Sequence, residues 1–232
     1  MGRAWMKHRN SHLLVGYWSR IRNGRDLPDQ ADIDPRAVKR MLSQIFILDA
    51  VNPVRPTYRL AGTGLCERFG MELKGTAFLA HWEAQSGAAL ASLLKQSQKT
   101  LQPLCLSSIG ATADCGMAEL ETVLAPIGFN NAEPTRFLGM TQILTDVMQL
   151  GGRPIAFQRL VASQLVREDD PTAAFTAPPP PPPPAVVLRS PSRAPHLRLV
   201  VSRDRPGDTL RFEAVDTLRR MFDMLGGKIA GV

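Results

Sequence analysis

The hydrophobic pattern between residues 11 and 24 predicts an amphipathic helix near the start of the chain. Ser11 is a good N-cap residue, and Gly24 is well placed to end the helix. The large apolar side chains recur at helical spacing and form one stripe, made of Leu13, Leu14, Tyr17, Trp18 and Ile21. Because this stripe needs a surface to cover, we expect the helix to pack on another part of the fold or on another molecule.

A second helix is expected after an acidic turn at residues 26–32. Asp34 suits the N-cap position, and Pro35 suits the first helical position because it has no N–H to lose there. The apolar positions of this helix would be Val38, Met41 and Leu42.

Short strands and small helices are predicted for the next part of the chain. Residues 45–48 and residues 58–61 are short apolar runs typical of strands. The glycine-rich segment 62–75 follows, and a short helix there could hold Leu65 and Phe69.

A longer helix at residues 87–101 is followed by a change in the hydrophobic period. Pro103 prevents the helix from running further, and apolar residues then alternate with polar ones in 104–106 and 120–124. A third strand is expected at residues 135–144, and the short links favour an antiparallel meander. The apolar stripe of the helix is Leu90, Leu93, Leu94, Ser97 and Leu101.

Proline and charge set the last part of the chain apart. We interpret residues 151–167 as a C-terminal extension of the core, 168–195 as a disordered proline-rich linker, and 196–232 as a basic tail with an amphipathic helix. Seven consecutive prolines, Pro178 to Pro184, could be a stiff spacer or a docking rod for an aromatic groove. The partner-docking candidates on the terminal helix are Leu218, Phe222 and Leu225.

The net charge of +7 is unevenly distributed. Residues 1–40 carry nine basic and four acidic side chains, whereas residues 41–150 carry seven and nine. A nearly neutral core with basic flanks argues against specific binding of nucleic acid, since such domains carry their cations on the folded part. No stretch has the roughly 20 apolar residues of a transmembrane helix.

The cysteines and histidines predict neither a disulfide framework nor a metal site. The three cysteines, Cys66, Cys105 and Cys115, lack any C-x-x-C spacing, which fits a reducing cytoplasm. His8 and His12 are four residues apart, but no acidic or cysteine ligand is near them, so we expect both to be solvated.

Several segments resemble one family. They are YWSRIRNGRDLPDQADIDPRAVKRMLSQIFILD, YRLAGTGLCERFGMELKGTAF, ETVLAPIGF and RFLGMTQIL. Together they are similar to the proteobacterial PAS subfamily known as PAS family 5, formerly a domain of unknown function. The resemblance covers residues 10–150, which leaves residues 1–9 as a flexible N-terminus. It implies an α+β fold with a five-stranded antiparallel sheet, helices on one face and an N-terminal helical cap, used for sensing, dimerisation or partner docking. It implies no catalytic residues.

Cofactor and catalytic motifs are weak. The segment GTGLCERFG has Glu67 where a dinucleotide fingerprint needs glycine, so its glycines are interpreted as turn residues. The sequence disfavours haem, because His81 lies before the long helix and not on it, and we expect His81 to pack on Trp82. It disfavours flavin too, because the N-C-R-F-L-Q motif of photoreceptor relatives is absent. Glu119 and Glu121 are expected to face solvent, and no histidine lies near them in the meander to act as a base.

These patterns favour a non-enzymatic, cytoplasmic PAS-type sensory or adaptor protein that acts on another signalling protein. We expect a homo-oligomer, with Tyr17, Trp18 and Ile21 as interface candidates. The alternatives are a ligand-free dimeric scaffold and a basic-tailed accessory of nucleic acid or of an acidic membrane surface. Either a small apolar cavity or a fully packed core could lie between sheet and helices, where the candidate residues are Phe78, Leu90, Leu94, Leu106 and Leu124.

Overall fold

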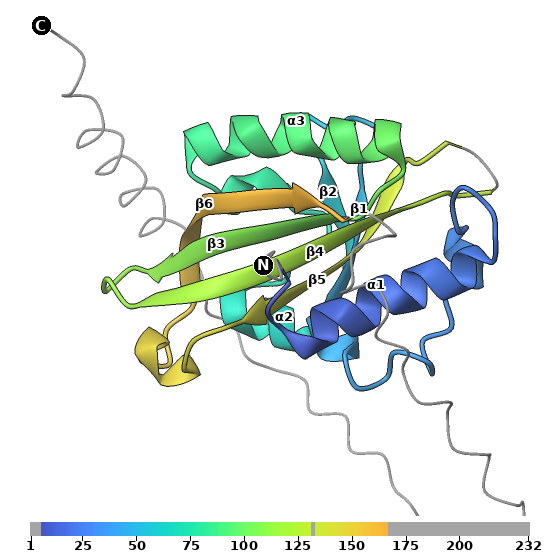
Figure 1. Cartoon of the computed structure of the whole chain (residues 1–232). Coiled ribbons are helices and arrows are strands. Elements are labelled where there is room, and N and C mark those ends of the chain that lie inside the picture. Colours follow the sequence, from blue (N-terminus) through green and yellow to red (C-terminus); the bar gives the residue numbers. More distant parts are fainter. Residues whose placement is uncertain (1–5, 131–132, 167–232) are drawn as a thin grey trace, which may run out of the picture. The chain divides into compact units, whose positions relative to one another are not determined.

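Six antiparallel strands form a single sheet in the order β2-β1-β5-β4-β3-β6 (Figure 1). The structure is a computed structural model that describes residues 6–130 and 133–166, all within the first of two units, Met1–Pro178 and Pro179–Val232. The predictions for 168–232, including Leu218, Phe222 and Leu225, lie outside the described residues. The strands are β1 (Ile45–Asp49), β2 (Thr57–Ala61), β3 (Leu104–Thr112), β4 (Met117–Ile127), β5 (Arg136–Ile143) and β6 (Ile155–Leu165).

Helices cover both faces of the sheet, whereas the sequence led us to expect them on one face. One hydrophobic cluster joins the sheet to α2, η3 and α3, and a second cluster joins the opposite face to α1 (Figure 1). The predicted N-terminal cap is therefore a layer on the outer side of the sheet. The helices are α1 (Arg9–Arg22), α2 (Thr63–Phe69) and α3 (Ala84–Thr100), with 3-10 turns η1 (Gln30–Asp32), η2 (Leu42–Gln44), η3 (Phe78–His81) and η4 (Val147–Leu150).

The antiparallel meander β3-β4-β5 is confirmed. Its first two strands are longer than expected and meet at a tight turn, where the Gly116 N–H donates to the Thr112 hydroxyl oxygen at 2.9 Å. Cys115 adopts a left-handed conformation in this turn, with φ of 66°. The link between the strands is therefore shorter than the nine residues inferred from the sequence.

The expected five-stranded sheet is wrong by one strand, because residues 155–165 add β6 beside β3. The pairing runs from Leu104 opposite Leu165 to Thr112 opposite Ile155. Gly151 and Gly152, both at positive φ, lie in the turn before the new strand. The sequence predicts no more than an extension of the core at residues 151–167.

The second helix predicted from Asp34 onwards is also wrong. Residues 35–41 form successive turns, closed by bonds such as Ala37 N–H to Asp34 O at 3.1 Å and Met41 N–H to Val38 O at 2.8 Å. The chain must enter β1 at Ile45, so only the short turn η2 follows. Val38 and Met41 are nevertheless buried, as their apolar spacing predicted.

The predicted ends of the other helices are approximately right. His8 is the N-cap of α1, so Ser11 lies inside the helix, and the left-handed Asn23 before Gly24 ends it. The helix α3 begins at Ala84, three residues before the position that we expected. The turn-glycine interpretation is confirmed at Gly62, where an added Cβ would lie 2.2 Å from the Leu42 carbonyl oxygen.

Candidate functional site

The five pocket candidates lie together in the cluster between the sheet and α3. All of them are buried, and they come from η3, α3, β3 and β4, which are distant in sequence. A ligand cavity among these side chains stays a prediction. The five candidates are Phe78, Leu90, Leu94, Leu106 and Leu124.

Aromatic side chains fill much of this interior, and two of them, Phe46 and Tyr58, are not among the pocket candidates from the sequence. The rings of Phe46 and Tyr58 are 5.4 Å apart, and those of Phe78 and Trp82 are 5.8 Å apart. Phe46 lies directly over Gly139 of the neighbouring strand, where an added Cβ would come within 2.2 Å of its ring. Only strand register reveals this pair, so no local sequence signal could have identified it.

Buried polar atoms interrupt the apolar interior. Trp82 is 5% exposed, and within the part of the chain that the structure describes its indole N–H has no hydrogen-bond partner. Burial, with a smaller contribution from Cys66, raises the pKa of the Tyr58 hydroxyl, which stays protonated. A buried donor without a partner costs free energy.

His81 contacts Phe69, and its expected packing on Trp82 stays a prediction. Its ring lies 4.9 Å from the ring of Phe69, at a tilt of 47°. His81 ends the short turn η3, and Trp82 then turns toward Phe78 as the chain enters α3.

On the opposite face, the three interface candidates belong to the packing of α1 on the sheet. Trp18 is 2% exposed, and its indole N–H donates to the Pro126 carbonyl oxygen at 2.7 Å. Tyr17 is buried and Ile21 is partly buried in the same cluster. An oligomer contact through these residues stays a prediction, but two of the three side chains are already buried within one chain.

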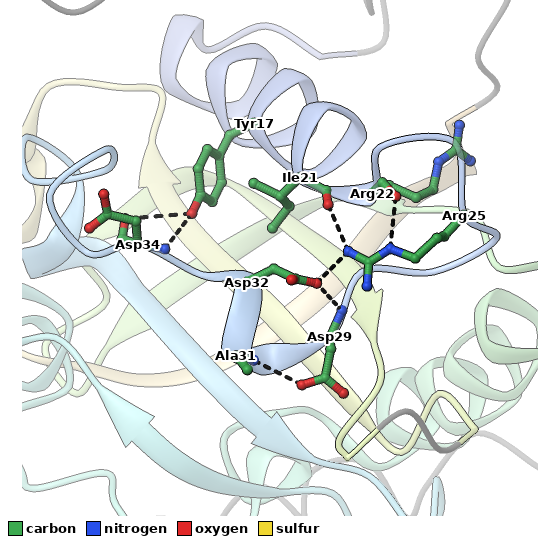
Figure 2. A network of polar contacts seen from close by, with 8 residues as sticks. All are labelled: Tyr17, Ile21, Arg22, Arg25, Asp29, Ala31, Asp32 and Asp34. Carbon is green, nitrogen blue, oxygen red and sulfur yellow. Dashed lines mark hydrogen bonds and ion pairs between the residues drawn. The ribbon is translucent and has the colours of Figure 1, made fainter.

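Polar contacts fasten the segment after α1 beneath the helix (Figure 2). The Tyr17 hydroxyl oxygen accepts the Asp34 N–H at 2.8 Å. The Arg25 guanidinium donates to the Ile21 carbonyl oxygen at 3.0 Å and to the Asp32 carboxylate at 2.5 Å. The backbone N–H of Asp29 first, and Arg25 second, hold the pKa of the Asp32 carboxyl below its usual value.

Glu121 is an acidic residue that the sequence led us to expect in solvent but that is buried. Glu119 is partly exposed, but Glu121 is 2% exposed and points toward the start of α1. Its carboxylate accepts the backbone N–H of Lys7 at 2.6 Å and that of His8 at 3.0 Å. Strand alternation put Glu121 on the outer face correctly, but α1 covers that face, which the local pattern could not indicate.

The segment before α1 is likewise ordered where we expected solvated residues. Met6 is buried, and its carbonyl oxygen lies 2.9 Å from Nε2 of His12. His12 is buried too, because α1 lies against the sheet. Ordered contacts therefore begin four residues before the boundary at residue 10.

The arrangement of strands and helices defines the class of fold. An antiparallel sheet in which β1 and β2 pair with the meander β5-β4-β3, with α2, η3 and α3 on one face, is a PAS-like α+β fold. The PAS domain family matches residues 6–142, more than half of the chain. The chain belongs to the PAS domain family, as its sequence segments suggested. The strand β6 lies beyond the matched region.

Solved structures are similar at low identity. One, titled as a flavin-analogue study of the light-oxygen-voltage domain mechanism, is 10% identical, with a TM-score of 0.39 over 48% of this chain and 84% of that chain. The Rhodobacter sphaeroides LOV protein is 15% identical, with a TM-score of 0.37 over 50% of this chain and 70% of that chain. The Vibrio cholera VqmA–ligand–DNA complex is 16% identical, with a TM-score of 0.35 over 50% of this chain and 54% of that chain. No curated protein matches the chain significantly.

Among residues 6–130 and 133–166, no group of three or more His, Cys, Asp or Glu side chains is arranged to hold a metal ion. None of the helices in these ranges is long and apolar enough to cross a membrane.

Proposed function

We propose that this chain is a non-enzymatic PAS signalling protein of the cytoplasm, which acts as a sensor or adaptor through contacts with another signalling protein. The observation that carries the proposal is the position of β4 between two layers. Its Leu120 and Leu124 belong to the interior cluster, whereas its Val123 and Ala125 belong to the cluster under α1.

This arrangement couples the interior to the outer helix. Side chains of a strand alternate between the two faces, so a displacement of β4 by a change in the interior also moves Val123 and Glu121. Glu121 holds the residues before α1, and the carbonyl of Pro126, also on β4, holds Trp18. A signal would thus shift the population of states in which α1 is docked or released.

Two observations bear on whether the protein senses a ligand. The unpaired indole N–H of Trp82 favours a small, mainly apolar ligand with one polar group, whereas the Phe46 ring over Gly139 favours a filled core. The proposed ligand is neither flavin nor haem. The prediction that haem and flavin are disfavoured stays a prediction.

Native mass spectrometry of the purified full-length protein separates the two roles. A small molecule retained at a fixed stoichiometry, and lost on unfolding, supports the sensor. A homo-oligomer without any small molecule contradicts the sensor and supports the ligand-free scaffold. A protein that carries co-purified nucleic acid or anionic lipid instead contradicts both and supports the basic-tailed accessory.

Amide hydrogen exchange tests the coupling itself. Leu94→Ala makes a cavity under α3 and does not touch α1, so we expect faster exchange in α1 as well as in α3. Met148→Ala, which alters a side chain that is 80% exposed, is the control and should leave both helices unchanged. Faster exchange in α3 with α1 unchanged would show that β4 does not couple the two faces.

A further inference from the structure

A groove of about 510 Å³ lies over β1 and β2, away from the interior cavity candidates. Four separate segments line it, namely η1, β1, β2 and the loop that carries Lys74. Ile47 and the half-exposed Leu60, 49% exposed, supply apolar surface, while Asp49, Arg59 and Lys74 supply charge. Its volume is in the range of small-molecule sites.

Arg59 occupies a β-bulge in the edge strand. Ile47 pairs with Leu60 and Leu48 pairs with Tyr58, so Arg59 has no opposite residue in β1. A bulge redirects a side chain relative to the regular alternation of a strand. Arg59 lines the groove next to Leu60 as a result.

The negative charge of Asp49, which lines the groove, is already balanced by a neighbouring cation. Asp49 lies 4.0 Å from Nε of the buried Arg136, and it also accepts the Val51 N–H at 3.5 Å. Arg136 stacks on the Phe129 ring at 3.6 Å. Burial, and to a lesser extent the charge of Arg59, lowers the pKa of the Arg136 guanidinium, so Asp49 is needed there as a counter-charge.

Arg59 and Lys74 are left without an anion. Within residues 6–130 and 133–166, neither side chain makes an ion pair or a hydrogen bond. Two unpaired cations beside an apolar floor make the groove attractive to a molecule with a negative group and an apolar body.

We propose that this groove binds a small organic carboxylate. The carboxylate is held by Arg59 and Lys74, and the apolar part lies on Leu60 and Ile47. Arginine and lysine both form charge-assisted hydrogen bonds with a carboxylate, and the guanidinium can do so with two parallel bonds. The proposal rests neither on an interior ligand nor on the docking of α1, so its failure would leave the proposed signalling function untouched.

A titration of the ¹⁵N-labelled full-length protein with 4-phenylbutyrate, followed by amide chemical shifts, tests the site. We expect saturable shifts at Arg59, Leu60, Lys74 and Gly75, and binding at least tenfold weaker for the neutral 4-phenylbutyramide. Equal affinity for the neutral compound, or shifts centred elsewhere, would overturn the proposal. Inorganic phosphate is the third probe, and equal affinity for it would overturn the role of the apolar floor.

Variants that each remove one positive charge test whether Arg59 and Lys74 hold the carboxylate. Arg59→Gln and Lys74→Gln should each weaken 4-phenylbutyrate binding several-fold, and both effects should shrink at high salt. The control is Arg55→Gln, which removes the same charge from an exposed turn outside the groove and should leave affinity within twofold. Equal losses in all three variants would indicate a general charge effect and contradict a specific site. Unchanged spectra away from the mutation show that each variant is folded.

Discussion

Glu121 is the residue with the clearest consequence for α1. Its carboxylate is buried and accepts two backbone N–H groups just before the helix begins. Because glutamine offers only one acceptor oxygen there, Glu121→Gln leaves an unsatisfied donor and should lower the free energy of unfolding by about 1–3 kcal/mol. Urea denaturation measures the loss, and hydrogen exchange should show it first in α1.

Glu119 provides the matched control for this prediction. It lies two positions away on the same strand, and its side chain forms an exposed ion pair with Lys7 at 3.4 Å. Glu119→Gln should therefore change stability by less than about 0.5 kcal/mol. Equal effects of the two variants would mean that the buried carboxylate does not hold the helix.

The contact between Phe46 and Gly139 leads to a second prediction, which concerns the stability of Gly139 variants. Gly139→Ala places a Cβ within 2.2 Å of a ring that is wedged between neighbours, so we expect a loss of about 1–3 kcal/mol. The same change in a Phe46→Leu background should cost much less. Gly87→Ala in α3, where nothing lies within 4 Å of the added Cβ, should instead stabilise by about 0.5–1 kcal/mol. Thermal unfolding of the four proteins checks the set, and an undiminished loss in the Phe46→Leu background would contradict the contact.

Asp32 should make the stability of the folded protein depend on pH. Its pKa in the folded protein is below the ordinary value of 3.8, so its contribution to stability is fully present above that pH and is lost as the pH falls through the folded value. Asp32→Asn should cost up to about 1 kcal/mol at pH 7 and less at pH 2. Unfolding of both proteins at the two pH values measures this difference. A loss for Asp32→Asn that persists undiminished at pH 2 would argue against the ionised contact.

At the scale of elements, β6 shows how a strand outside the family match becomes part of the core. Ile155 is buried in the interior cluster, whereas Val161 of the same strand is 61% exposed. Ile155→Ala should therefore lower the free energy of unfolding by about 2–4 kcal/mol. Val161→Ala should change it by less than about 0.5 kcal/mol. If chemical denaturation gave small losses for both, β6 would be an appendage of the sheet and not a core strand.

At the scale of the whole molecule, the question is whether α1 also takes part in self-association. Trp18 is buried against its own chain, so Trp18→Ala should cost about 3–5 kcal/mol without any partner. Urea midpoints at two protein concentrations, a hundredfold apart, distinguish the two roles. An equal loss at both concentrations places Trp18 within the monomer. A loss that grows with concentration would support the oligomer contact expected from the sequence.

Most elements followed from local patterns. The α1 stripe, the helix after residue 84, the two short strands and the meander all have the period of their structure over several residues. The predictions failed at residues 35–41 and at β6. In both segments the hydrophobic period was weak, and contacts with the rest of the fold decided the secondary structure. Between Asp34 and Gln44, packing favours turns over a helix. Residues 155–165 form a strand because they pair with the free edge of β3.

The sequence by itself determined the family, the order of the elements and which faces are apolar, because these depend on the spacing of neighbouring residues. Only the tertiary structure decided which apolar face covers which side of the sheet, since that depends on contacts between residues far apart in the chain. Leu124 could thus be assigned to the interior from the sequence, whereas the burial of Glu121 could not. The groove at Arg59 likewise required the register of β1 and β2, because a bulge exists only in the pairing of two strands.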